Sequence, residues 1–296
     1  MRAVTHGLPL KRRVRVGPAE IAYIESGDDA APPMVLVHGF PTHSYLWRHV
    51  MYELGDAVHA FAPDLLGLGD TVVSPYEDFT APMQAELMLE WFDRLGLDRV
   101  ALVAHDMGGA VAQQIVANHP ERVSHLALVD SVAYDGWPVP FVQSIMRVAR
   151  TPGLDTVAYA LDLPRRVAHN TRVGFARAMW DSTRIDTDVI DEYLRPITTI
   201  EGRERARRFL LAADSRVTLE ALPGLRAFTG PALVAWGADD VFLSPSWGLR
   251  LVDDLVGAER LELLPFCGHL VPEERPAELA ALLLALLERP ERPRAG

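Results

Sequence analysis

The sequence predicts an α/β protein with a mostly parallel central sheet that is flanked by helices and interrupted by a helical insertion. Short apolar runs that suit strands alternate with helical stretches over the first part of the chain, residues 1–131. Between residues 132 and 215 the alternation stops, and the sequence is helical and rich in arginine. The alternation returns over residues 216–296. We therefore expect one core built from residues 1–131 and 216–296, with a helical cap at 132–215.

Two antiparallel strands are expected near the N-terminus. Residues 13–16 and 21–24 each alternate in side-chain polarity, and the Gly17-Pro18 pair between them is typical of a turn. Residues 34–37 instead form a continuous apolar run, which suits a strand buried on both faces of a sheet. Residues 59–62 are a further short strand candidate.

The rest of the core is expected to alternate between helix and strand. Before the insertion the expected elements are a helix at 82–95, a strand at 100–104, a helix ending near 119 and a strand at 126–129. After the insertion they are a strand at 231–237, a helix at 246–256, a strand at 260–264 and a final helix at 276–287.

The charge balance narrows the class of partner. Asp and Glu number 40 against 29 Lys and Arg, which gives a formal net charge of −11 at pH 7. An acidic chain is a poor non-specific binder of nucleic acid, so no nucleic-acid partner is expected. The one basic run, residues 11–13, is expected to be a solvated strand edge.

No membrane segment, disulfide or metal site is expected either. The apolar run 279–287 is too short to span a membrane, and the N-terminus lacks the apolar region of a signal peptide. The single cysteine, Cys267, cannot form an internal disulfide or supply a zinc site that needs two cysteines. These features predict a cytoplasmic protein, a monomer or homodimer, that acts on a small molecule without cofactor or metal.

The most informative stretch is residues 103–109, where a predicted strand runs into a predicted helix. Ala104 and Gly108 are small enough for a sharp turn with Asp106 at its apex, as in the small-x-nucleophile-x-small elbow. The Asp106 side chain would then project above the sheet beside the start of the helix. Because aspartate is also a good N-cap, this stretch alone leaves both interpretations open.

Two later segments favour the catalytic interpretation. Asp240 follows the predicted strand 231–237, and His269 lies in the loop after the last predicted strand. The chain order of nucleophile, acid and histidine is that expected of a hydrolase, and ligands bind at the carboxyl edge of parallel strands. Taken alone, Asp240 also suits a turn, His269 suits a structural role, and Cys267 suits a buried inert thiol.

With these residues in place, the chain resembles the α/β-hydrolase family, in the branch with an aspartate nucleophile. That branch includes epoxide hydrolases, haloalkane dehalogenases and fluoroacetate dehalogenases. The resemblance spans nearly the whole chain outside the insertion and implies the α/β-hydrolase fold. It rests on the stretches His38-Gly39-Phe40-Pro41-Thr42, Asp64-Leu65-Leu66-Gly67-Leu68-Gly69-Asp70, His105-Asp106-Met107-Gly108-Gly109, Trp236-Gly237-Ala238-Asp239-Asp240 and Cys267-Gly268-His269.

The residue types point to a reaction at a saturated carbon. An aspartate is ionised near neutral pH, with a reference pKa of about 3.9, so Asp106 can displace a leaving group and form an alkyl-enzyme ester. His269 would then activate water to hydrolyse the ester, and Asp240 would orient His269. The backbone N–H groups of Phe40 and Met107 would hold the oxyanion.

The orienting acid has two candidates. Asp240 fits the Trp-Gly-x-x-Asp pattern of the resembled family and is preferred. Asp130 is the alternative, because it ends the strand before the insertion, 24 residues after Asp106, where several aspartate-nucleophile relatives keep their acid.

The substrate class depends on what stabilises the leaving group. In the resembled epoxide hydrolases cap tyrosines protonate the epoxide oxygen, and Tyr159, 53 residues after Asp106, is the candidate here. In haloalkane dehalogenases indole or amide N–H groups hold the halide, whereas Met107 and Phe40 stand at those positions without a side-chain N–H. An epoxide hydrolase is therefore the preferred interpretation.

Two alternatives stay open. One is a haloalkane dehalogenase with an atypical halide site built from tryptophans of the insertion, Trp137 and Trp180. The other is a catalytically idle small-ligand-binding protein on the same fold, because a fold alone does not imply activity.

Overall fold

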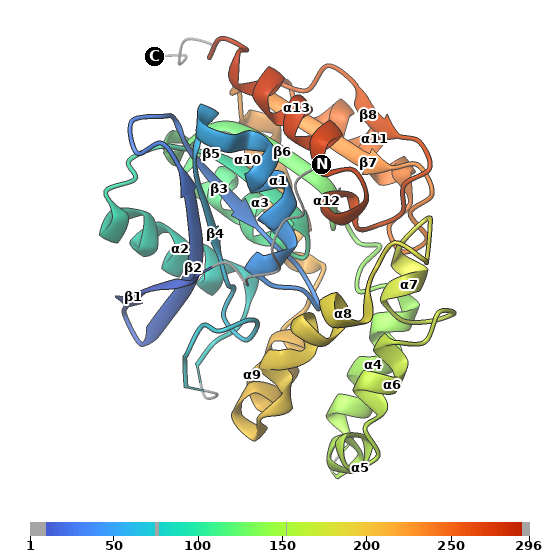
Figure 1. The fold of residues 1–296 in the computed structure, drawn as a ribbon. Coiled ribbons are helices and arrows are strands. Elements are labelled where there is room, and N and C mark those ends of the chain that lie inside the picture. Colours follow the sequence, from blue (N-terminus) through green and yellow to red (C-terminus); the bar gives the residue numbers. More distant parts are fainter. Residues whose placement is uncertain (1–9, 75–76, 152, 292–296) are drawn as a thin grey trace.

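The centre of the molecule is an eight-stranded sheet with the order β1-β2-β4-β3-β5-β6-β7-β8 (Figure 1). The computed structural model describes residues 10–74, 77–151 and 153–291. Strands β4, β3, β5, β6, β7 and β8 run parallel, and β2 runs antiparallel to both β1 and β4. This confirms the predicted mostly parallel α/β sheet. The strands are β1 (Arg12–Val16), β2 (Ala19–Gly27), β3 (Pro33–Val37), β4 (His59–Pro63), β5 (Val100–Asp106), β6 (Val123–Ser131), β7 (Ala232–Gly237) and β8 (Leu261–Leu264).

Helices flank both faces of this sheet (Figure 1). The α-helices are α1 (Arg48–Leu54), α2 (Ala81–Leu95), α3 (Gly108–Asn118), α4 (Pro140–Arg150), α5 (Leu154–Ala160), α6 (Leu163–Ala168), α7 (Phe175–Ala178), α8 (Thr187–Leu194), α9 (Ile200–Leu211), α10 (Arg216–Ala227), α11 (Pro245–Asp254), α12 (Val271–Glu274) and α13 (Pro276–Leu287). Short 3-10 helices are η1 (Ser44–Trp47), η2 (Gly55–Ala57), η3 (Pro120–Arg122) and η4 (Arg195–Thr198). In the described parts of the chain, no helix combines the length and the apolar character that a membrane span would need.

The predicted N-terminal hairpin is confirmed. Arg13 of β1 pairs with Ala22 of β2, and Val16 pairs with Ala19 at the turn. Gly17 in that turn has a φ of 50°, in the left-handed region that glycine adopts at little cost.

Alternate residues of β3 contribute to two separate cores. Val35 and Val37 point into a core with residues of α2, α3 and α10, and Met34 and Leu36 point into a core with residues of α1 and α13. Successive side chains of a strand face opposite sides of the sheet, so one continuous apolar run supplies both cores. This is the physical reason why residues 34–37 show no polar alternation.

The helical insertion lies between Ser131, at the end of β6, and Ala232, at the start of β7, and the described residues there contain no strand. Helices α4 to α9 project beyond the carboxyl edge of the sheet (Figure 1), whereas α10 packs against α3 of the core. The predicted boundaries, 132 and 215, bracket α4 to α9. That this segment acts as a separate cap domain remains a prediction.

The prediction that residues 11–13 form a solvated edge is wrong for Lys11. Its side chain is 13% exposed, and its ammonium lies 2.6 Å from Asp64 and 2.8 Å from Asp70. The side chains of Arg12 and Arg13 are solvated as expected, at 63% and 43% exposure. Position along the strand therefore does not decide exposure here, because Lys11 reaches a buried carboxylate that needs a partner.

Candidate active site

Asp106 lies at a sharp turn where β5 ends and α3 begins. Its φ is 51°, a left-handed conformation that is uncommon for residues other than glycine and often found at functional sites. A Cβ atom at Gly108 would lie 2.3 Å from the backbone oxygen of His38, so the turn requires glycine there. Among the described residues, no side chain accepts a capping hydrogen bond at the start of α3. Asp106 therefore does not serve as an N-cap, which is the other interpretation of the sequence.

The Asp106 carboxylate is held by backbone donors. The N–H of Phe40 donates to Oδ1 at 2.8 Å, and the N–H of Met107 also stabilises the charged form. Burial alone would raise the pKa of Asp106, but His269, His105 and the Met107 N–H outweigh it and lower the pKa. The carboxylate is therefore ionised and already occupies the donors predicted for the oxyanion.

His269 lies between two carboxylates in the loop after β8. Its Nδ1 is 2.9 Å from Oδ2 of Asp240, and its Nε2 is 3.5 Å from Oδ2 of Asp106. Burial alone would lower the pKa of His269, but the Asp240 and Asp106 carboxylates raise it well above the usual value. With both carboxylates charged, the imidazole is thus held in its protonated form.

Asp240 is the acid that contacts His269. Its Oδ1 accepts the N–H groups of Phe242 at 2.7 Å and Leu243 at 3.0 Å, in the turn after β7. These two bonds fix the carboxylate and leave Oδ2 directed at His269. The arrangement agrees with the preferred assignment from the sequence.

Asp130, the alternative acid, lies in the same cluster. Ligand atoms of Asp130, Asp240 and His269 all lie within 4.8 Å of one another. Oδ1 of Asp130 accepts the N–H of Gly237 at 2.9 Å, while its buried Oδ2 has no hydrogen-bond partner among the described residues. Burial and then the Asp240 charge raise the pKa of Asp130 well above its usual value, which favours the neutral acid.

Two buried histidines support the loops around Asp106. His38 donates from Nδ1 to the backbone oxygen of Gly39 at 3.0 Å and accepts the N–H of Leu65 on Nε2 at 3.0 Å. His105 donates from Nε2 to the backbone oxygen of His269 at 2.8 Å. Burial lowers the pKa of each histidine to about 4, so both are neutral near pH 7 and act as fixed hydrogen-bond partners.

An apolar pocket adjoins the turn at Asp106. Met107 lines it together with Phe79, Trp137 and Phe209. The ring of Phe40 stacks on Phe209 with a centroid distance of 6.4 Å. The side chains beside the nucleophile candidate are thus mostly apolar.

The structure does not bring Tyr159 to Asp106. Tyr159 lies in α5, at the end of the insertion farthest from the sheet (Figure 1), and its ring lies 4.6 Å below the guanidinium carbon of Arg203. Tyr159 is a candidate in the sequence because it follows Asp106 by 53 residues. That separation along the chain does not show how helices α4 to α9 are arranged in space.

Two further tyrosines of the insertion, and the two tryptophans considered for a halide site, also lie in surroundings of their own. The hydroxyl of Tyr134 donates to Asp254 at 2.7 Å, and that of Tyr193 donates to Glu273. The indole N–H of Trp137 donates to the Thr218 hydroxyl at 2.9 Å, and Trp180 is 52% exposed.

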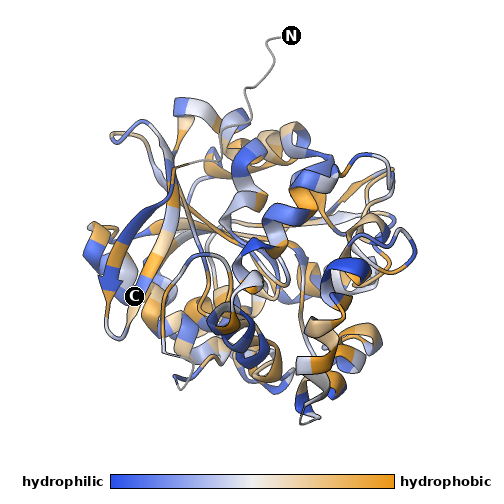
Figure 2. Cartoon of the chain, turned by 60° about the horizontal axis from the view of Figure 1, so that its bottom comes forward, coloured by the Kyte–Doolittle hydropathy of each residue, from blue (hydrophilic) through white to orange (hydrophobic). Residues whose placement is uncertain are grey.

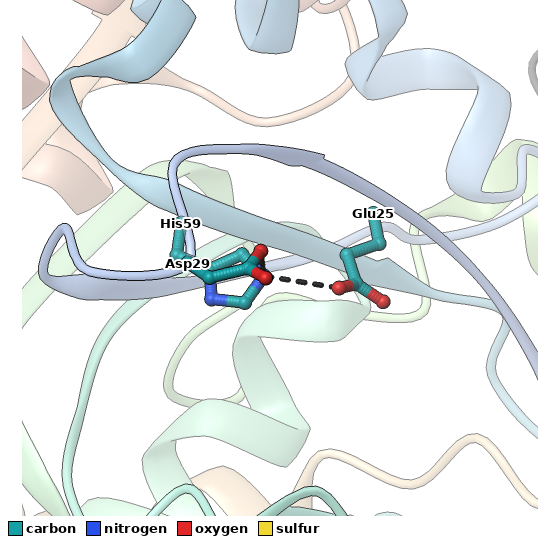
Figure 3. Close-up of side chains that lie close together, drawn as sticks. All are labelled: Glu25, Asp29 and His59. Carbon is teal, nitrogen blue, oxygen red and sulfur yellow. Dashed lines mark hydrogen bonds and ion pairs between the residues drawn. The ribbon is translucent and has the colours of Figure 1, made fainter.

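Two groups of side chains have the composition of a metal site. In the first, Asp130, Asp240 and His269, both oxygens of Asp240 and Oδ1 of Asp130 are bonded to His269 or to backbone N–H groups, whereas Oδ2 of Asp130 has no partner among the described residues. The second is Glu25, Asp29 and His59 (Figure 3), near the amino end of β4, of which His59 is the first residue.

The surface group is an ion-pair network. His59 Nε2 lies 3.0 Å from Glu25, and the other Glu25 oxygen lies 2.8 Å from Arg12. Asp29 is 91% exposed. Because Arg12 already neutralises the Glu25 carboxylate, this group needs no metal ion to balance its charge.

Sequence reasoning missed Glu274, the residue that anchors the His269 loop. Its buried carboxylate accepts backbone N–H groups from two segments, described below. The sequence gives no signal for this role, because Glu274 and its neighbour Glu273 are the same residue type and nothing in the sequence distinguishes them.

A carboxylate, an imidazole and a second carboxylate thus lie together at the carboxyl edge of this sheet. The chain belongs to the alpha/beta hydrolase fold family, which matches residues 32–276. This confirms the family and the fold that the sequence resemblance implied.

Proteins similar to this chain include epoxide hydrolases and haloalkane dehalogenases. The chain is 27% identical over 267 residues to a soluble epoxide hydrolase of Corynebacterium sp. (strain C12), covering 86% of this chain and 88% of that protein. It is 27% identical over 279 residues to a haloalkane dehalogenase of Mycolicibacterium paratuberculosis, covering 90% and 87%. The structure of a putative ancestral haloalkane dehalogenase superposes with a TM-score of 0.78 at 25% identity, covering 94% of this chain and all of that one.

Proposed function

We propose that this hydrolase attacks a saturated carbon with Asp106 and forms a covalent ester that His269 then helps to hydrolyse. The observation that carries the proposal is the alignment of Asp106, His269 and Asp240. Asp106 is ionised and 13% exposed, His269 lies 3.5 Å from it, and Asp240 fixes the far side of the imidazole at 2.9 Å. An ionised carboxylate needs no base to become a nucleophile, unlike a serine hydroxyl.

The first step would open an epoxide ring. One carboxylate oxygen of Asp106 bonds to an epoxide carbon, the ring C–O bond breaks, and the released oxygen takes a proton from water. The product is an alcohol joined to Asp106 through an ester.

The second step would hydrolyse that ester. Alkylation removes the negative charge of Asp106, which is one of the causes that raise the pKa of His269. The imidazolium then releases its proton to the solvent more readily, and the neutral imidazole can accept a proton from the attacking water. The water oxygen bonds to the ester carbonyl carbon while the N–H groups of Phe40 and Met107 hold the oxyanion. The acyl C–O bond then breaks, the His269 imidazolium protonates the leaving alkoxide, and the diol leaves with the Asp106 carboxylate restored.

An epoxide suits this site better than a halide. A departing halide needs N–H donors, but the side chains of Phe40 and Met107 are apolar and the indole N–H of Trp137 is bonded to Thr218. The haloalkane dehalogenase relative keeps halide displacement as the second candidate. Both reactions share the alkyl-enzyme ester.

The test is intact-protein mass spectrometry of the His269→Gln variant with styrene oxide and, separately, with 1-bromobutane. Because the variant lacks the base, we expect the ester to accumulate. A mass gain equal to the whole epoxide supports ring opening, and a gain equal to the butyl group alone would make the protein a dehalogenase. The double variant Asp106→Asn/His269→Gln is the control and should gain no mass.

Two further outcomes decide the remaining alternatives. If Tyr159 protonates the epoxide oxygen, adding Tyr159→Phe to the His269→Gln variant slows adduct formation. An absence of adduct with both electrophiles, together with tight binding of a small ligand, would favour the idle binding protein over an aspartate nucleophile.

A further inference from the structure

Glu274 is a buried carboxylate that bonds only to backbone N–H groups among the described residues. It ends α12, five residues after His269, and it is 5% exposed. A buried carboxylate is costly unless hydrogen bonds satisfy its oxygens. The identity of its donors therefore shows what the side chain holds in place.

The donors come from two segments that are far apart in the sequence. Oε2 accepts the N–H of Gly268 at 2.6 Å, directly before His269. Both oxygens accept the N–H of Trp180, at 3.0 and 3.1 Å, and Oε1 accepts that of Asp181 at 3.2 Å. One side chain thus bridges the His269 loop and the part of the insertion that follows α7.

The backbone of this part of the insertion also touches the His269 loop directly. The N–H of His269 donates to the backbone oxygen of Ala178 at 2.7 Å. A Cβ atom at Gly268 would lie 2.3 Å from that same oxygen, so the two backbones are in close contact. The direct contact uses the N–H of His269 and the carboxylate bridge uses the N–H of Gly268, so two successive N–H groups of the loop are held.

We propose that Glu274 is a positioning residue for His269, which it holds by tying the Gly268 backbone to residues 178–181 of the insertion. From this backbone position the imidazole reaches both Asp240 and Asp106. The proposal rests on the proposed function for one point, the role of His269 as the base. Its geometric part, that Glu274 holds the imidazole against Asp240, stands apart from any reaction.

The two chemical steps should depend on Glu274 to different degrees. Asp106 is held by the Phe40 N–H and by the turn before α3, and neither contacts Glu274. Ester formation should therefore proceed without the bridge. Ester hydrolysis needs His269 in place, and a displacement of about 1 Å can cost a catalytic step roughly 100-fold.

The test variant is Glu274→Gln. The amide keeps the size of the side chain, but its NH₂ group cannot accept a hydrogen bond, so at least one backbone N–H loses its partner. We expect ester formation at the native rate and ester hydrolysis slowed roughly 10- to 100-fold. The ester should then accumulate during turnover of styrene oxide, as measured by quenched-flow mass spectrometry.

The matched control is Glu273→Gln at the preceding position. Glu273 is also buried, at 7% side-chain exposure, but it pairs with Arg48 and Tyr193 instead of the His269 loop. This variant should melt at a lower temperature while both steps keep their native rates. A general loss of stability would slow both steps in both variants. Slow ester hydrolysis with native-rate ester formation, in Glu274→Gln alone, therefore identifies a positioning role.

A second readout needs no substrate. The His269 Nδ1 proton that is shared with Asp240 gives a downfield proton resonance in NMR spectra, and its loss in His269→Gln assigns it. We expect this resonance to broaden or move in Glu274→Gln and to stay unchanged in Glu273→Gln. An unchanged resonance in a folded Glu274→Gln protein, or native-rate ester hydrolysis, would overturn the proposal. If the His269→Gln variant forms no ester, the proposed function fails, and the resonance still decides the geometric part.

Discussion

At the scale of single residues, the site is defined by the different surroundings of chemically identical side chains. Asp106, Asp130 and Asp240 are all buried or nearly so, yet the pKa of Asp106 is lowered and that of Asp130 is raised. Burial acts on both, and the outcome depends on whether N–H donors and an imidazole or another carboxylate lie nearby. A nucleophile and a neutral acid can therefore come from the same residue type.

The neutral state of Asp130 is testable with Asp130→Asn. Asparagine matches the uncharged acid in size, so we expect near-native turnover, whereas Asp240→Asn removes the partner of His269 and should lower turnover by a factor of roughly 10⁴. Turnover of both purified variants under identical conditions checks the contrast. A comparable loss in both would mean that Asp130 acts as a carboxylate.

The same substitution has a signature in stability against pH. A pKa raised on folding contributes stability that is fully present below the unfolded value, about 3.9, and is lost as pH rises through the folded value. Asp130 should therefore make the free energy of unfolding of the native protein fall as pH rises above about 3.9. Urea denaturation of Asp130→Asn over the same pH range should show a smaller fall.

The sequence could not decide between the two acids for a geometric reason. Asp130 and Asp240 follow adjacent parallel strands, β6 and β7, so both reach the same edge of the sheet. Which carboxylate contacts His269 depends on the backbone N–H groups that fix each one, and these are invisible in a sequence. Asp106 was easier to predict, because the small residues that a sharp turn requires, Ala104 and Gly108, can be read directly from the sequence.

At the scale of elements, Lys11, directly before β1, ties the N-terminal segment to the loop after β4 through Asp64 and Asp70. Asp64 is fully buried and accepts the backbone N–H of Ser44 at 2.8 Å and that of Asp70 at 2.7 Å. Burial alone would raise the pKa of Asp64, but the Lys11 ammonium, with nearby histidines, lowers it to about 2. The loop from β4 to Asp70 thus depends on a cation that comes from the N-terminal segment.

We predict that Lys11→Met lowers the free energy of unfolding by about 3 kcal/mol, because it leaves the Asp64 charge buried without its cation. Urea denaturation at pH 7 measures the change. Arg13→Met is the control, since Arg13 and its partner Glu20 are both exposed and such pairs contribute about 1 kcal/mol or less. Equal effects of the two substitutions would contradict the assignment.

The contribution of this pair also has a defined pH window. A pKa lowered on folding gives stability that is present above the unfolded value, about 3.9, and is lost as pH falls through the folded value, about 2. The difference in stability between native protein and Lys11→Met should therefore shrink on acidification below about pH 4.

At the scale of the whole molecule, the insertion and the two parts of the core share buried side chains. Phe175 and Tyr193 from the insertion belong to the same apolar cluster as Leu46 and Leu270 from the core. The hydropathy colouring in Figure 2 shows apolar segments in the core and in the insertion alike. Composition could separate residues 132–215 from the rest of the chain, but it could not reveal these contacts.

We therefore predict that the chain unfolds in one cooperative transition. Far-UV circular dichroism, tryptophan fluorescence and the accessibility of the active site to an electrophile should give coincident urea curves. An early transition that is confined to the insertion would instead show that residues 132–215 form a separately stable unit.

The position of Cys267 gives the chain an internal reporter. It is the only cysteine, it is fully buried directly before Gly268, and burial together with the Glu274 charge raises the pKa of its thiol. A thiol reagent can reach it only when the structure around the His269 loop opens. The labelling rate of the unmodified protein thus measures how often this loop opens, without an added probe or an engineered residue.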